Sequence, residues 1–228
     1  MLATSRLSVT AAARSRAARL ARGGSEPYCR GMSLTPLILG LILFLGVHAF
    51  TMRREARAAL VGRLGMGPYR GLYSLLAVIG FVLIIWGYGQ YRSSGMIPVW
   101  YPPYWTRHIT FLLMLLAFIL LGASHAPTHI RQYIRHPMIT AVILWAGGHI
   151  LVRGDLGSIV MFGAFLLWGV VGLASMLRRK PDDVQGPAPP RDPRWQVDIG
   201  VVVIGLAVYL AFLFWLHPLL IGIPLLTS

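Results

Sequence analysis

The side chains best suited to chemistry in this sequence are its seven histidines, because the long apolar stretches hold almost no other ionisable group. Those stretches contain essentially no carboxylate, which disfavours a proton pump, an ion-coupled transporter or a hydrolase with a carboxylate base. The single cysteine, Cys29, excludes an internal disulfide and a cysteine-rich metal site. Chemistry inside the apolar part of the chain therefore falls to histidine.

Two histidines, His48 and His149, lie within apolar stretches rather than between them. A polar group in hydrocarbon is costly unless it is satisfied, and ionisable residues inside a membrane span usually face the protein interior and mark function. Neutral imidazole is a good axial ligand for haem iron, and the small residues at 146–148 leave room for a flat macrocycle. The alternative interpretation is a structural histidine bonded to a neighbouring helix.

The tripeptide Arg135-His136-Pro137 stands at the predicted start of the stretch that holds His149. Proline suits the first turn of a helix, where its missing N–H leaves no bond unmade. His136 precedes His149 by 13 positions, roughly 220° around a helix at about 100° per residue, so the two should face different partners. Arg135 and His136 are predicted at the membrane surface, where anchoring to lipid headgroups is the alternative to a functional role.

The other four histidines give weaker signals. His108 and His217 lie near the predicted outer ends of two apolar stretches, where histidines are common. His125 and His129 have a spacing that can bind a metal on a helix, but Pro127 between them disfavours a regular turn. No cysteine or carboxylate nearby in the sequence completes a zinc site.

The elements that must position these histidines are long and apolar. Of 228 residues, 56% are hydrophobic and 12% are charged, and an ordinary soluble domain has about twice that charged fraction. A membrane span needs roughly 20 apolar residues. We therefore predict an all-α protein, a polytopic transmembrane helical bundle of about six spans in a lipid bilayer, followed by a short interfacial piece at Leu219–Leu226. The predicted spans are Leu34–Phe50, Leu72–Gly89, Ile109–Ser124, Met138–Leu151, Ile159–Leu177 and Ile199–Leu216.

Small residues recur within these predicted spans. Small side chains let transmembrane helices approach one another closely, so the pattern indicates a compact bundle. It does not indicate what the bundle holds. The glycines concerned are Gly80, Gly87, Gly147, Gly148, Gly163, Gly169 and Gly172.

The basic residues lie mainly between the apolar stretches. A formal net charge of +14 would suggest a nucleic-acid partner in a soluble protein. Here no nucleic acid is expected, because Arg and Lys in the connections act as topology signals. The links after spans one, three and five hold twelve of them, and those after spans two and four hold three. This bias predicts that the twelve face the cytoplasm and that both termini are non-cytoplasmic.

Residues 1–31 differ from the rest, with six Arg and a single acid, Glu26. Such a segment resembles an organelle leader, and a basic surface helix is another interpretation. We favour a start at Met32, directly before the first span, because six further positive charges on the outer side would weaken the topology bias. The predicted division is a basic extension over 1–31 and a transmembrane domain over 32–228.

Several pieces of the chain together resemble the NnrU family of membrane proteins. They are Leu34–Gly40, His48, Arg135-His136-Pro137, Trp145 with His149, and His217–Leu220. The resemblance covers the chain from Met32 to its end. It implies a protein of the bacterial inner membrane that is associated with nitrite and nitric oxide reduction in denitrifying bacteria.

The family is similar in turn to the plastid 15-cis-zeta-carotene isomerase, a multi-span enzyme that uses haem b. The resemblance implies haem b here, with His48 and His149 as the axial ligands of the iron. Ala146 stands where that relative has a cysteine, which excludes a thiolate role. The implied role is redox-linked. It would involve a redox partner in nitrogen-oxide respiration, or a small apolar polyene as the substrate of a cis–trans isomerisation.

The two implied ligands are predicted at different depths. His48 lies five residues before Arg53, about 7 Å from the cytoplasmic end at 1.5 Å per residue. His149 lies twelve residues after Pro137, about 18 Å from that end. Helix tilt must absorb the difference of about 11 Å if both are to reach one iron. His125 and His136 are therefore the reserve ligands.

Two alternative functions stay open. The tripeptide before the fourth span also resembles membrane methyltransferases that use S-adenosylmethionine on isoprenylcysteine or phospholipid amines. In those enzymes a Tyr and a Gly follow, where this chain has Ile139 and Ala141, and an acidic pair follows later, for which Asp182 and Asp183 are the candidates. The second alternative is a non-catalytic accessory or carrier protein.

Overall fold

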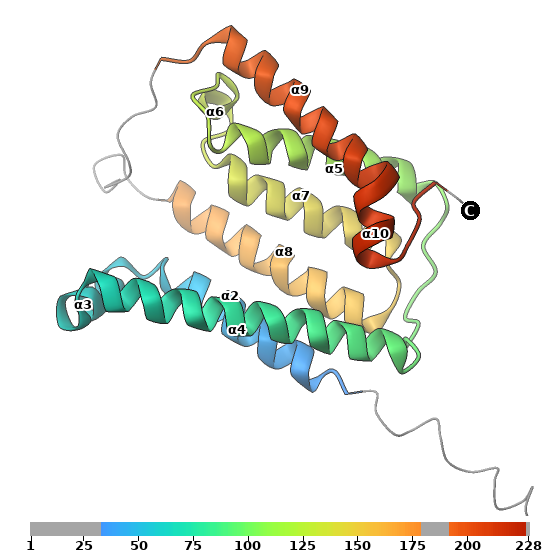
Figure 1. The fold of residues 1–228 in the computed structure, drawn as a ribbon, viewed down its shortest axis with the longest axis horizontal. Coiled ribbons are helices and arrows are strands. Elements are labelled where there is room, and N and C mark those ends of the chain that lie inside the picture. The colour runs from blue at the N-terminus through green and yellow to red at the C-terminus, as the bar shows by residue number, and fades with distance from the viewer. Residues whose placement is uncertain (1–32, 179–191, 227–228) are drawn as a thin grey trace, which may run out of the picture.

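The computed structural model describes residues 33–178 and 192–226, and the regular structure in these two ranges is helical (Figure 1). No strand occurs in them; Pro98 and Asp155 form an isolated bridge. The predicted all-α class is confirmed. The extension over 1–31, the favoured start at Met32 and the acidic pair at 182–183 lie outside the described residues.

Each of the six predicted spans corresponds to a helix, and shorter helices lie in the links. The helices are α2 (Thr35–Phe50), α3 (Arg54–Leu64), α4 (Met66–Ser93), α5 (Thr106–Ala123), α6 (Ile130–Tyr133), α7 (Pro137–Val152), α8 (Leu156–Leu177), α9 (Trp195–Ala211), a π-helical turn (Phe212–Leu216) and α10 (His217–Ile221).

Four helical segments among the described residues are long and apolar enough to cross a membrane: α4, α5, α8 and the stretch from α9 through α10. A fifth candidate is α2 together with α3, although the two are bent by 91° at a short break. α7 is apolar but shorter, with 16 residues. The predicted polytopic bundle is confirmed, and the predicted count of about six agrees when α7 is included.

The spans lie side by side in the order α4, α2, α8, α7, α5, α9, which differs from their order in the chain (Figure 1). One end of the molecule holds α3 and α6. Three spans end there, α2, α5 and α8, and three begin there, α4, α7 and α9. We refer to this as the α3 end. Consecutive spans along the chain therefore run in opposite directions.

Close backbone approach between α2 and α4 depends on glycine. A Cβ atom at Gly87 would lie 2.4 Å from the Leu37 backbone nitrogen, and one at Gly80 would lie 2.7 Å from that of Phe44. Leu37, Leu41 and Ile84 form the buried core beside this crossing. The predicted role of small residues in close helix packing is confirmed at these two positions.

A proline defines the start of α7, and a hydrogen bond to α5 holds it near its other end. Pro137 occupies the first turn, as predicted from the sequence, and His136 precedes it as the N-cap residue. Near the other end, the buried hydroxyl of Thr110 on α5 donates to the carbonyl oxygen of Gly148 at 2.9 Å. These contacts orient the helix that carries His149.

Candidate functional site

The two histidines within the spans share one local arrangement. His48 donates its Nδ1–H to the carbonyl oxygen of Phe44 at 2.6 Å, and His149 donates its own to that of Trp145 at 2.8 Å. Each acceptor lies four residues earlier in the same helix. Because a carbonyl oxygen only accepts, the hydrogen sits on Nδ1 in the neutral ring and Nε2 keeps a lone pair. Both imidazoles therefore present Nε2 as a potential metal ligand.

His48 lies among aromatic rings from three helices. Its ring centroid is 4.3 Å from that of Phe44 on α2, 5.5 Å from Tyr73 on α4 and 6.1 Å from Trp168 on α8. The indole Nε1 of Trp168 is buried and has no hydrogen-bond partner among the described residues. A buried donor left in this state costs free energy, so the surroundings of His48 offer an unused hydrogen-bond donor.

His149 has a comparable setting on the other side of α8. Phe162 of α8 stacks on its ring at 4.6 Å, and Trp145 lies 5.4 Å away. His217 of α10 and Arg153, which follows α7, are near enough to act on it electrostatically. The sequence suggested only an interfacial position for His217, so its proximity to His149 is a feature that sequence reasoning missed.

A chain of aromatic contacts connects the two histidines through α8. Phe165 lies 5.9 Å from Phe44 and 5.3 Å from Trp145, ring centre to ring centre. His48 contacts α8 at Trp168 and His149 contacts it at Phe162, six residues earlier. At 1.5 Å per residue the two contact levels differ by about 9 Å. The structure thus brings both histidines to α8, and the aromatic rings that connect them lie between them.

Each histidine by itself fits haem iron in its chemistry, since a neutral imidazole with a lone pair at Nε2 is a common axial ligand. Shared ligation of one iron needs both nitrogens within about 2 Å of the metal. The offset along α8 and the interposed rings do not meet that requirement in this arrangement. The donor atoms therefore fit the cofactor, whereas their spacing requires the aromatic side chains to move.

The reserve ligands lie near the α3 end. His125 is exposed after α5, where its Nδ1 lies 2.7 Å from the Ser124 hydroxyl. His136 caps α7, about 20 Å along that helix from His149. Arg135 is exposed beside it. The tripeptide and the in-span histidine of α7 therefore occupy opposite ends of one helix.

A polar contact at the start of α9 was not predicted. Asp198 in the first turn of α9 is 7% exposed, and it accepts bonds from His129 Nδ1 at 2.5 Å and from the His129 backbone N–H at 2.9 Å. Trp195 stacks on the same imidazole at 4.6 Å. Sequence reasoning considered His129 together with His125 instead. It missed Asp198 because this residue lies 69 positions away from His129 in the chain.

Comparison with known protein families identifies the chain. Residues 36–225 match the family described as NnrU protein. The chain belongs to the NnrU family. The NnrU match runs from α2 to residue 225 and includes His48, Arg135–Pro137, His149 and His217. Comparisons with curated proteins and with solved structures gave no match.

Proposed function

We propose that this NnrU-family protein binds haem b in the membrane, with Nε2 of His48 and of His149 as the iron ligands. The observation that carries the proposal is the shared geometry of these two residues. Each lies within an apolar helix and has its Nδ1–H bound to its own backbone. That arrangement fixes the ring orientation and leaves one nitrogen of each for a metal.

The surrounding residues support an apolar macrocycle. Phe44 and Trp168 beside His48, and Phe162 beside His149, provide flat apolar surfaces around the two imidazoles. When bound, haem supplies a one-electron redox centre whose potential is tuned by its ligands and by burial. Ligation of one iron by both histidines requires Phe165 and Trp145 to leave the space between them.

The proposed role is redox-linked and supports nitrogen-oxide respiration, the process with which the NnrU family is associated. We place the protein in the bacterial inner membrane with its α3 end in the cytoplasm, because the links between spans at that end hold twelve Arg and Lys and those at the other end hold three. A second candidate role is cis–trans isomerisation of an apolar polyene. The aromatic surroundings of His48 and His149 favour it, since they suit an apolar substrate.

The test is an absorbance spectrum of the detergent-purified protein after expression with ample haem, recorded as isolated and after dithionite. We expect a Soret band and sharp reduced α and β bands. Ligation by both histidines predicts that His48→Ala and His149→Ala each lose the low-spin spectrum. His108→Ala, which changes an exposed histidine at the opposite end from α3, is the control and should keep it.

Three other outcomes have distinct meanings. A low-spin spectrum that survives both substitutions would retain haem but reject these ligands, and His125 and His136 would be tested next. Loss of the low-spin spectrum in only one of the two variants would mean that only the histidine changed in that variant binds the iron. No Soret band in folded, haem-replete protein would reject the proposed cofactor. Given bound haem, assays with nitric oxide and with a cis-polyene separate the two roles.

A further inference from the structure

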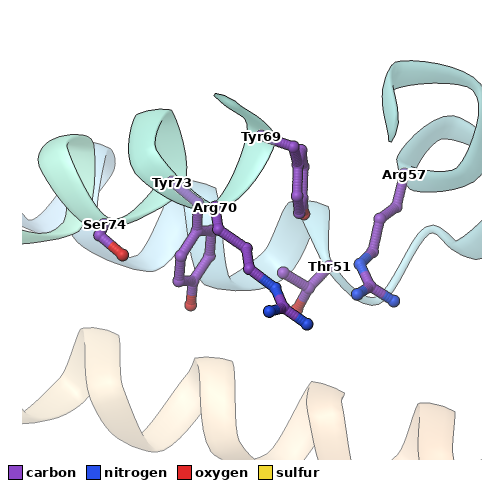
Figure 2. Close-up of a pocket in the computed structure, with 6 residues that line it drawn as sticks. All are labelled: Thr51, Arg57, Tyr69, Arg70, Tyr73 and Ser74. Carbon is purple, nitrogen blue, oxygen red and sulfur yellow. The ribbon is translucent and has the colours of Figure 1, made fainter. Parts of the chain in front are cut away.

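A cavity of about 340 Å³ lies at the α3 end, where α2 bends into α3 and α4 begins (Figure 2). Each lining residue carries a guanidinium or a hydroxyl group, and no acidic residue is among them. The lining residues are Thr51, Arg57, Tyr69, Arg70, Tyr73 and Ser74.

The two arginines converge although they come from different helices. Arg57 on α3 and Arg70 on α4 extend their guanidinium groups towards the same space, with Thr51 between them (Figure 2). Arg57 also lies over the ring of Tyr69, 5.7 Å from its centre. Two guanidinium groups brought together without a carboxylate favour the binding of an anion, and their planar forks match carboxylate and phosphate oxygens.

Tyr69 gives an independent indication of a ligand. The residue is 6% exposed, yet its hydroxyl has no hydrogen-bond partner among the described residues. The side chain points towards Thr51 and the space between the arginines (Figure 2). A buried hydroxyl without a partner is costly. An oxygen atom of a bound anion would satisfy it.

The cavity also adjoins the surroundings of His48. Tyr73 lines the cavity, and its ring lies 5.5 Å from that of His48. The cavity thus stands at the end of the spans, while the aromatic group around His48 lies deeper within them. This arrangement suits an amphipathic molecule with its charged end in the cavity and its apolar body along the aromatic group around His48.

We propose that Arg57, Arg70 and Tyr69 bind the anionic oxygen group of an amphipathic molecule whose apolar part lies in the membrane. Two sources share this chemistry: the phosphate of an anionic phospholipid, and the propionate carboxylates of a haem held at His48. The second source rests on the proposed function and the first does not. The proposed roles of Arg57, Arg70 and Tyr69 are the same for either ligand.

The first experimental arm measures lipid binding to the purified, full-length protein. Native mass spectrometry would compare phosphatidylglycerol with phosphatidylcholine at equal concentrations. We expect the double variant R57Q/R70Q to bind phosphatidylglycerol about tenfold more weakly, and phosphatidylcholine equally well. The matched control is R54Q/R63Q, which removes two exposed charges of α3 that do not line the cavity. Tyr69→Phe removes only the hydroxyl and should give a smaller loss.

The second arm compares haem with its dimethyl ester, which lacks free carboxylates. If the propionates occupy the site, wild-type protein binds haem about tenfold more tightly than the ester, and R57Q/R70Q removes that preference. His48→Ala weakens both ligands alike, which tests the proposed function separately. If the protein binds no haem, the proposed function fails and the lipid arm alone decides.

The outcomes distinguish the two ligand sources, and some of them would reject the anion site itself. Loss of phosphatidylglycerol preference alone assigns the site to phospholipid, and loss of the haem–ester difference alone assigns it to haem. If R57Q/R70Q and Tyr69→Phe retain wild-type helicity and change neither preference, the anion site is rejected. A change of equal size in R54Q/R63Q would also reject it, because the effect would then be general surface charge.

Discussion

The two in-span histidines show how a helix can hold a polar side chain in hydrocarbon without help from another helix. The bond from Nδ1–H to the carbonyl four residues earlier satisfies one ring nitrogen locally, so Nε2 alone is left for a partner. The sequence predicts which histidines lie in the spans, and residue counting predicts a depth difference of about 11 Å. This is close to the separation of about 9 Å between the residues of α8 that the two histidines contact. It cannot predict the interposed rings, because these depend on which face α8 turns towards α2 and α7.

At the same scale, the contact between His129 and Asp198 gives a stability prediction. Asp198→Ala removes two hydrogen bonds to a buried carboxylate and leaves the His129 amide without an acceptor. We expect the free energy of unfolding to fall by about 2–3 kcal/mol. Denaturant titration of the detergent-solubilised protein, followed by circular dichroism, would measure it.

The control for that measurement is Asp192→Ala, which changes an exposed acid before the same helix. Its effect should stay within about 0.5 kcal/mol. Equal losses in the two variants would mean that Asp198 contributes only through its charge near the start of α9.

Among the elements, the crossing of α2 and α4 is the most tightly determined. Recurrent glycines predict close packing somewhere, but not which helices meet, because a small residue is compatible with any neighbour. α3 was not predicted, since its mixed and partly charged sequence looks like a connection. The 91° bend before it is nevertheless what brings Arg57 towards Arg70. The anion cavity was therefore beyond sequence reasoning, as its two arginines belong to elements whose relative angle is set by tertiary packing.

Two glycines of α4 provide a matched test of this crossing. Gly87→Ala places a Cβ 2.4 Å from the Leu37 backbone nitrogen, which cannot move away as a side chain could. Gly89→Ala, two residues later, meets nothing within 4 Å. Both substitutions gain the same helix propensity, up to about 1 kcal/mol. We expect Gly87→Ala to destabilise the protein by about 1–3 kcal/mol through overpacking, and Gly89→Ala to be neutral or stabilising.

Thermal unfolding of the two variants beside the wild type would check this. Similar melting temperatures for both variants would contradict a backbone contact at Gly87 and imply that α2 and α4 are further apart.

For the whole molecule, the apolar stretches predict the number and approximate bounds of the spans, and the basic links predict their direction. The lateral order of the spans could not be predicted. Lipid-facing and protein-facing surfaces are both apolar here, so the sequence carries little signal about neighbours. The order places α8 between the two histidine-bearing helices, which is why residues more than a hundred positions apart share one aromatic chain.

The direction of the spans can be tested by cysteine labelling. In a Cys29→Ser background, single cysteines would replace Arg63 at the α3 end and Tyr101, 85% exposed, in the opposite link. A membrane-impermeant maleimide added to spheroplasts should label Tyr101→Cys at once and Arg63→Cys only after permeabilisation. The reverse order would invert the proposed topology. Immediate labelling of both would contradict their placement on opposite sides of the membrane.

The lengths of α2 and α7 have a consequence for the surrounding lipid. Each has 16 residues, whereas α4 has 28. At 1.5 Å per residue the short helices measure about 24 Å, less than the roughly 30 Å of a typical hydrocarbon core. The bilayer must thin beside them or their polar flanks must be drawn inwards. Because α2 carries His48 and α7 carries His149, the elastic cost of that mismatch acts on the helices that position the two histidines. The acyl-chain length of the host membrane thereby becomes a variable of the site itself.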